Sequence, residues 1–204
     1  MKRGRSQVGR LRVRQVTLVA LILLSLVPGQ AAAGDWSPSD IPGHWPSFLL
    51  GMAGLVAFHE TGHVLVASSA GYNIGNRGPS IVYDPAFRSR ADHLRVASAG
   101  FQAQWLATEA AFASGDKGGN FAAGVVCGHL ATSLAYLVVL KNNPRGDTVG
   151  MAAASGLSVN QVAALAAAPA LLDAWRLFGN DVPRWVPVLS LALKGTEISA
   201  VWAF

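Results

Sequence analysis

The stretch "VAFHETGHVLVASSAG", residues 56–71, places two histidines and a glutamate inside an otherwise apolar run. Ionisable side chains are costly in apolar surroundings, and within a membrane they usually mark a functional site. His59 and His63 are four residues apart, so on a helix both imidazoles lie on the same face. The stretch therefore predicts a helix that carries a functional pair of histidines into a hydrophobic environment.

The composition around this stretch indicates a membrane protein. Of the 204 residues, 51% are hydrophobic and only 13% are charged, and that charged fraction is about half the usual share in soluble domains. We therefore expect the lipid bilayer to be the immediate partner of the chain. The alternative is a soluble all-α protein in which the apolar runs are core helices, but their length and close spacing argue against it.

The net charge of +5 gives no support to nucleic-acid binding. Six basic residues and no acidic ones fall within residues 1–14, and without these six, ten basic residues remain against eleven acidic ones. A basic binding surface is therefore not expected outside the first residues. Cys127 is the single cysteine, which excludes an intrachain disulfide.

Residues 1–33 have the pattern of a secretory signal peptide. A basic stretch precedes the apolar segment "VTLVALILLSLVP", and the small residues Ala31 and Ala33 predict cleavage before Gly34. The alternative is an uncleaved anchor helix. Either reading leaves residues 34–204 as a helical membrane domain whose first residue lies outside, in what we expect to be the cytoplasmic membrane of a bacterium.

Long apolar segments follow one another along the rest of the chain. Each approaches the roughly 20 residues that a helix needs to cross a bilayer. Arginines in segment 71–94 and basic residues in segment 141–157 place both loops on the cytoplasmic side. We therefore expect an all-α, polytopic protein with a short cytoplasmic loop or hairpin at 71–94 and about five mature transmembrane helices: 47–70, 95–113, 121–141, 158–178 and 185–204.

The motif His59-Glu60-x-x-His63 predicts a zinc site. Two imidazoles on one helical face can bind one Zn²⁺, and a third protein ligand leaves one coordination position open for chemistry. Glu60 lies one position further round the helix, where it can act as general base toward a water molecule. The structural alternative is a pair of histidines and a glutamate that only form hydrogen bonds to neighbouring helices.

The motif extends beyond these five residues. His59-Glu60-Thr61-Gly62-His63, with Ala67 and Gly71, reads H-E-x-G-H-x-x-x-A-x-x-x-G, which resembles the site-2 protease family of intramembrane zinc metalloproteases. The segment "SAGFQAQ", residues 98–104, is similar to the start of the next helix in that family, with Phe101 where proline is usual. The resemblance implies a zinc metalloendopeptidase that hydrolyses a peptide bond of a membrane-embedded or juxtamembrane protein segment.

The same resemblance implies an aspartate ligand from a later segment, and more than one residue fits. Asp147 in "NNPRGDT" follows an asparagine and a proline, in the family's order, although its glycine precedes it. Asp173 in "PALLDAWR" is the second candidate, with a pairing to Arg176 as its structural alternative. His129 is a further possibility that does not come from the resemblance: it follows Cys127 by two residues, and a Cys-x-His pair can bind metal, although a lone histidine there can also hydrogen-bond to a neighbouring helix. We favour Asp147 because the expected topology places it nearer to His63 in depth.

Two other functions remain open at this stage. A membrane metal-binding protein without peptidase activity would keep both histidines and tolerate the change Glu60→Gln. An inactive scaffold relative would have lost the metal altogether, and the imperfect context of Asp147 leaves room for it.

Overall fold

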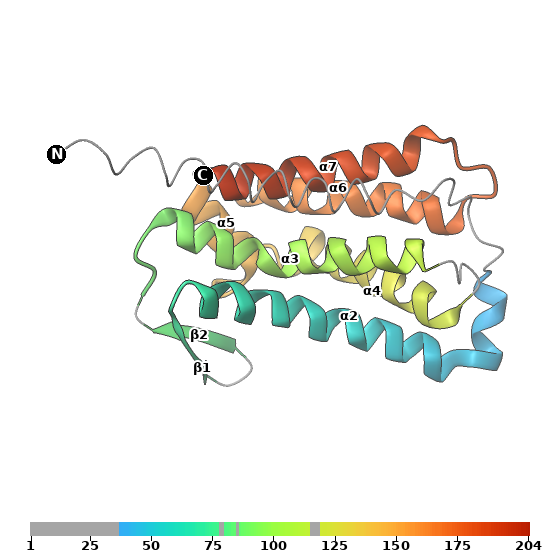
Figure 1. The fold of residues 1–204 in the computed structure, drawn as a ribbon, viewed down its shortest axis with the longest axis horizontal. Coiled ribbons are helices and arrows are strands. Elements are labelled where there is room, and N and C mark those ends of the chain that lie inside the picture. The colour runs from blue at the N-terminus through green and yellow to red at the C-terminus, as the bar shows by residue number, and fades with distance from the viewer. Residues whose placement is uncertain (1–36, 78–79, 85, 115–118) are drawn as a thin grey trace.

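The computed structural model describes residues 37–77, 80–84, 86–114 and 119–204, so the expected signal segment 1–33 lies outside the described residues. Long helices run side by side along the molecule, and a small hairpin lies at one end (Figure 1). The elements in chain order are the short 3-10 helix η1 (Pro38–Asp40), α2 (Ile41–Ser69), β1 (Asn73–Arg77), β2 (Ser80–Asp84), α3 (Arg90–Ala113), α4 (Asn120–Val138), α5 (Asp147–Ser155), α6 (Val159–Phe178) and α7 (Trp185–Ala203).

Helix α2 carries the histidine motif and ends where the motif ends. Its first turn is kinked at His44, where the backbone leaves helical geometry. At the other end, Gly71 adopts a φ of +77°, a left-handed conformation that glycine enters without steric cost. The last glycine of the motif therefore stops the helix and turns the chain into β1.

The expected hairpin is present in segment 71–94. β1 and β2 pair antiparallel, with Ile74 opposite Tyr83 and Gly75 opposite Val82. The sequence indicated a loop or hairpin in this segment without the bounds of either strand. Tyr72 and Ala67 pack with Val96 at the base of the hairpin, which ties it to α2 and α3.

The five apolar segments form five long helices, but the expectation of about five membrane spans is wrong. Within the described part of the chain, two helices are long and apolar enough to cross a membrane: Pro38–Ser69, which joins η1 to α2, and α4. A third span is possible if α5 and α6, bent by 117°, count as one. α3 and α7 carry polar and charged side chains, such as Glu109 and Lys194, which the surrounding helices bury. Ionisable side chains in a helical bundle can face its interior and pair with one another, and their presence in α3 and α7 lowers the hydropathy of these two helices.

Helix α5 was not expected, because segment 141–157 reads as a polar cytoplasmic loop. Its nine residues follow a turn through Asn143 and Gly146, and the helix ends at Gly156, whose φ is +84°. The Gly and Pro residues before it are typical of a loop, so the sequence shows no sign of this short helix. Its buried face includes Thr148 and Ala154. The bend after α5 sends the chain back along α6.

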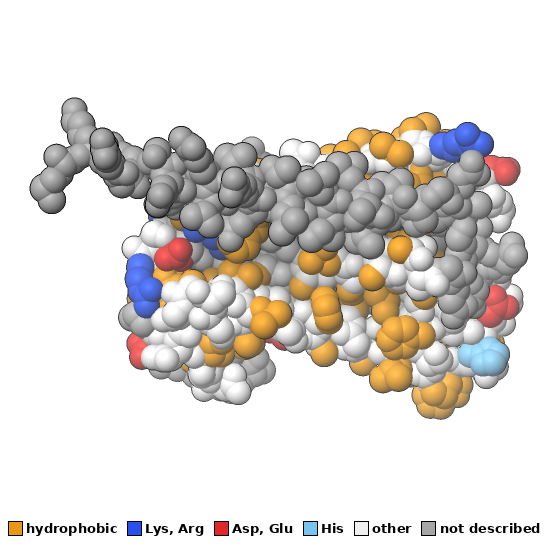
Figure 2. All heavy atoms as spheres, in the orientation of Figure 1, with side chains coloured by type: hydrophobic (Ala, Val, Ile, Leu, Met, Phe, Trp, Pro, Cys, Tyr) orange, Lys and Arg blue, Asp and Glu red, His pale blue; other side chains and the backbone are white. Residues whose placement is uncertain are grey.

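The outer surface is largely apolar. Figure 2 shows charged side chains at the two ends of the molecule and hydrophobic ones along the length between them. Large apolar side chains point outward from several helices, and such an extensive apolar exterior is characteristic of a surface that faces lipid. Examples are Leu50, Phe58, Leu65, Leu134, Val138, Leu171 and Val188.

Glycines bring α2 into close contact with its neighbours. A Cβ on Gly124 would collide with the backbone carbonyl of Phe48, and a Cβ on Gly128 would lie 3.1 Å from the Cα of Met52. A Cβ on Gly62, inside the motif, would meet the carbonyl of Ala99 on α3. These contacts show that Gly124 and Gly128 allow close helix packing, and they hold α2 between α3 and α4.

Candidate metal centre

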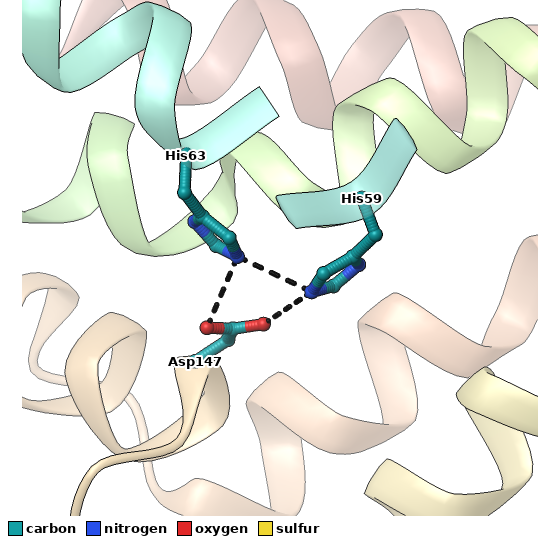
Figure 3. A group of neighbouring side chains, drawn as sticks. All are labelled: His59, His63 and Asp147. Atoms are coloured by element: carbon teal, nitrogen blue, oxygen red, sulfur yellow. Dashed lines mark hydrogen bonds and ion pairs between the residues drawn. The ribbon is translucent and has the colours of Figure 1, made fainter. Parts of the chain in front are cut away.

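His59 and His63 both point from α2 into the protein, as their spacing predicts. Their side chains are about 96% buried, and they converge on Asp147 at the start of α5 (Figure 3). Asp147 follows His59 by 88 positions in the chain, and the three residues are the group of potential metal ligands found among the described residues. The structure therefore brings together the two motif histidines and the favoured one of the three candidate third residues.

The distances within this group fit a single tetrahedral cation. Nε2 of His59 lies 2.9 Å from Oδ2 of Asp147, and Nε2 of His63 lies 3.3 Å from Oδ1. The two Nε2 atoms are 3.2 Å apart. Ligand atoms bound at about 2.0–2.1 Å to one tetrahedral zinc are separated by about 3.3 Å. Two imidazoles and a carboxylate with this spacing are a suitable donor set for Zn²⁺.

The remaining nitrogen of His63 determines how that ring is protonated. Its Nδ1 lies 2.7 Å from the backbone carbonyl of Val96, which can only accept a hydrogen bond. Nδ1 therefore carries the proton, and the lone pair of the neutral ring is on Nε2, facing Asp147. Orientation of a ligating histidine by a carbonyl on its far nitrogen is common at protein metal sites.

Helix α3 approaches the two histidines closely enough to require a glycine. A Cβ on Gly100 would collide with Nε2 and Cε1 of His59 and with Nε2 of His63. The side chain of Gln104, one turn further along α3, contacts Nδ1 of His59. Gly100 thus leaves room for the imidazole nitrogens, while Gln104 meets the far side of His59.

Asp147 is held by its helix and by a tyrosine. It occupies the first turn of α5, where the unpaired backbone N–H groups favour a carboxylate. Tyr136 on α4 donates its hydroxyl to Oδ2 at 2.8 Å. The ring of Tyr136 also stacks on His59, with 6.1 Å between the ring centroids. One side chain therefore contacts two of the three candidate ligands.

A cavity of about 550 Å³ opens beside the group, at the end of the molecule that carries the hairpin. Its walls include Glu60 and Asp147, strand β2, and the turn before α5. Burial, together with the negative charges of Asp147 and Glu60, raises the pKa of Tyr83 on β2 to about 12. The cavity therefore presents a neutral tyrosine hydroxyl and the carboxylate of Glu60 next to the three candidate ligands.

The other candidate ligands lie outside this group. Asp173 forms ion pairs with Arg176, three residues along α6, and with Lys194 of α7. The Asp173–Arg176 pairing is the structural alternative that the sequence allows. His129 is fully buried on α4 and contacts Gln104 rather than the motif histidines.

Sequence reasoning missed several residues near the centre. Tyr136 gave no signal, because nothing in the sequence places the end of α4 next to α5. Gln104 and Gly100 lie in the segment "SAGFQAQ", but the sequence linked neither residue to the histidines. His93 gave no functional signal in the sequence, yet it lines the cavity and stacks on Phe87 with 4.5 Å between the ring centroids.

Comparison of the chain with protein-family models, with curated proteins and with solved structures finds no match.

Proposed function

We propose that this protein is a zinc-dependent intramembrane peptidase of the site-2 protease type, hydrolysing a peptide bond in a membrane-embedded or juxtamembrane segment of another protein. The observation that carries the proposal is the convergence of His59, His63 and Asp147 to within 4.8 Å, beside a cavity that contains Glu60. The apolar exterior and the two or three candidate spans support a location in the membrane.

Zn²⁺ bound to these three residues would polarise the scissile carbonyl and lower the pKa of a water molecule toward neutrality. The chain itself supplies the orientation of the ligands. Val96 fixes the ring of His63 through its carbonyl, and Tyr136 fixes the carboxylate of Asp147 through its hydroxyl. Such partners of ligands typically contribute about 10–100-fold to metal affinity or activity.

Glu60 is the proposed general base. It follows His59 directly on α2, is exposed, and lines the same cavity as His63 and Asp147. There it can take a proton from the attacking water and return it to the leaving amine nitrogen. Among the described residues, no ion pair of Glu60 competes with this role, whereas the buried acids Glu109 and Asp173 are both paired with Lys194.

The cavity walls favour a peptide substrate in an extended form. Ile81, Val82 and Tyr83 of β2 line one side, and the turn from Asn143 to Gly146 lines another. Both segments belong to the end of the molecule that the charge pattern assigns to the cytoplasm. A segment of a membrane protein unwound at that end would meet the candidate ligands without passing through the helices.

The test uses the full chain purified in detergent, with zinc measured per chain and cleavage assayed on a model transmembrane substrate. We expect about one zinc per chain in the wild type and in Glu60→Gln, with cleavage by Glu60→Gln reduced by about 10²–10⁴-fold. Asp181→Asn, an exposed acid in the turn before α7, is the matched control and should cleave normally. Removal of the metal with a chelator should abolish cleavage, and added Zn²⁺ should restore it.

Other results would separate the remaining functions. Zinc bound without cleavage by the wild type would indicate a metal-binding protein that is not a peptidase. A wild type that binds no zinc would indicate a scaffold. Normal cleavage by Glu60→Gln would rule out Glu60 as the base.

A further inference from the structure

A line of buried polar side chains leads from the candidate metal centre into the middle of the helices. It starts at Nδ1 of His59, passes through the amide of Gln104, and reaches Nδ1 of His129, which lies 3.0 Å from that amide. Nε2 of His129 then faces Oδ2 of Asp173 at 3.6 Å. Gln104, His129 and Asp173 are all fully buried. The line thus joins α2, α3, α4 and α6 out of reach of solvent.

Asp173 is the fixed negative end of this line. Its Oδ1 accepts hydrogen bonds from Arg176 at 3.0 Å and from Ser190 at 2.7 Å, and its Oδ2 accepts one from Lys194. Both cations also bind Glu109, at 2.6 Å each, so two anions and two cations balance one another. A carboxylate in such a group stays ionised and can only accept hydrogen bonds.

The charge on Asp173 decides which nitrogen of His129 carries the proton. Nε2 of His129 has no hydrogen-bond partner among the described residues, and its nearest acidic oxygen belongs to Asp173. A lone pair on Nε2 would face a negative oxygen and be repelled, whereas an N–H there is attracted. The proton therefore belongs on Nε2, which leaves Nδ1 of His129 as an acceptor.

The amide of Gln104 links the protonation of His129 to that of His59. Because Nδ1 of His129 accepts a hydrogen bond, the Gln104 group that faces it must be the NH₂ donor. The amide oxygen of Gln104 then faces Nδ1 of His59. In the structure the amide nitrogen of Gln104 faces His59 and the amide oxygen faces His129. A half-turn of the amide exchanges these two atoms, which are of almost equal size, and gives the required orientation. Nδ1 of His59 then donates its proton to the amide oxygen, which leaves Nε2 available to a cation beside Asp147 and His63.

We propose that Gln104 and His129 are positioning residues for the metal centre: anchored on Asp173, they hold His59 in the tautomer whose Nε2 can bind a cation. The inference rests on the proposed function, because it assigns a role at the same site. It adds that a balanced group of four charged side chains, on α3, α6 and α7, sets the protonation of a ligand on α2.

The first test reads the tautomers directly in wild type by nitrogen NMR of isotope-labelled histidine, first without metal and then with added Zn²⁺. We expect the proton of His129 on Nε2 already in the metal-free protein, and the proton of His59 on Nδ1 once a cation occupies Nε2 in place of a proton. A proton on Nδ1 of His129 would overturn the inference, whether or not the protein proves to be a peptidase. This measurement needs no variant and so does not depend on a mutant that folds.

The second test measures Co²⁺ affinity in detergent from the visible absorption of the bound metal, together with the thermal unfolding of each variant. Gln104→Met should weaken Co²⁺ binding about 10–100-fold, and Gln104→Glu should restore it, because a carboxylate also accepts from Nδ1 of His59. The matched control is Gln102→Met, since Gln102 is a buried glutamine on the same helix that bonds Ser98 and Trp202 instead. It should bind Co²⁺ as the wild type does.

The outcomes distinguish this inference from the proposed function. Equal affinities of Gln104→Met and Gln102→Met, with normal Co²⁺ binding by the wild type, would overturn the positioning role alone. Absence of Co²⁺ binding by the wild type would overturn both.

Discussion

Tyr136 is the residue outside the histidine motif with the most direct contact to the candidate ligands. Its hydroxyl donates to Asp147, and its ring packs against His59 and Phe101, with 5.0 Å between the centroids of Tyr136 and Phe101. The hydroxyl and the ring therefore have separable roles: the first orients the carboxylate, and the second fills the space beside the imidazole.

Replacing Tyr136 by Phe separates these roles, because the ring stays and only the donor is lost. We expect Tyr136→Phe to weaken Co²⁺ or Zn²⁺ binding about tenfold with little change in thermal stability. Metal titration in detergent measures the effect. Tyr72→Phe is the control, since the Tyr72 hydroxyl bonds Asp92 and the backbone of Arg88 at the hairpin base; it should bind metal normally. Unchanged affinity in Tyr136→Phe would show that Asp147 needs no donor.

At the scale of elements, the position of Asp147 depends on how α5 is anchored. The hydroxyl of Thr148, next to Asp147, is buried and donates to the carbonyl of Lys141 at 2.9 Å. This bond spans the turn between α4 and α5. At the other end of α5, Ser155 accepts from the backbone of Leu157 at 3.2 Å, away from the candidate ligands.

The change Thr148→Val removes this anchor while keeping the side-chain shape. It leaves a carbonyl without its donor, so we expect a loss of about 1–3 kcal/mol in the free energy of unfolding and weaker metal binding, because the first turn of α5 can shift. Ser155→Ala should leave metal binding unchanged. Thermal unfolding and metal titration of both variants check this; equal effects at the two ends of α5 would contradict it.

At the scale of the whole molecule, the buried charges join helices that the sequence separates widely. Lys194 of α7 binds Glu109 of α3 at 2.6 Å and also pairs with Asp173 of α6. Removing a single partner leaves an uncompensated charge in the interior, which costs about 3–5 kcal/mol. Removing one cation and one anion together keeps the balance.

We therefore expect Lys194→Met to destabilise the protein strongly, and Asp173→Asn combined with Lys194→Met to cost less than the sum of the two single changes. Thermal unfolding of the two single variants and the double variant provides the comparison. Additive losses would mean that the charges do not depend on one another.

The topology can be tested with cysteine labelling, because Cys127 is the only native cysteine. In a Cys127→Ser background, Gly75→Cys in the hairpin and Asn143→Cys before α5 should react with a membrane-impermeant reagent from the same side. Asp181→Cys, in the turn between α6 and α7, lies at the opposite end of the molecule (Figure 1) and should react from the other side. Labelling of all three positions from one side would contradict a membrane-crossing arrangement.

Local sequence was sufficient for the helices and for the histidine pair. The spacing of His59 and His63 fixes their common face on a helix, and the long apolar segments predict the five long helices. Gly71 follows the first of these helices in a left-handed conformation, which glycine adopts without steric cost. These features depend on residues near one another in the chain, so the sequence alone determined them.

Only the tertiary structure decided what these helices enclose. The number of candidate spans is two or three rather than five. The reason is that α3 and α7 carry charged residues, Glu109 and Lys194, which lie buried between helices. Hydropathy along the sequence does not show whether such a residue is buried or exposed. The selection of Asp147 over Asp173 and His129 as neighbour of the histidines, and the contacts of Tyr136 and Gln104, depend on how α5 folds back beside α2 and α3. Contacts between segments so far apart in the chain arise from the packing of helices, and the spacing of neighbouring residues in the sequence does not predict them.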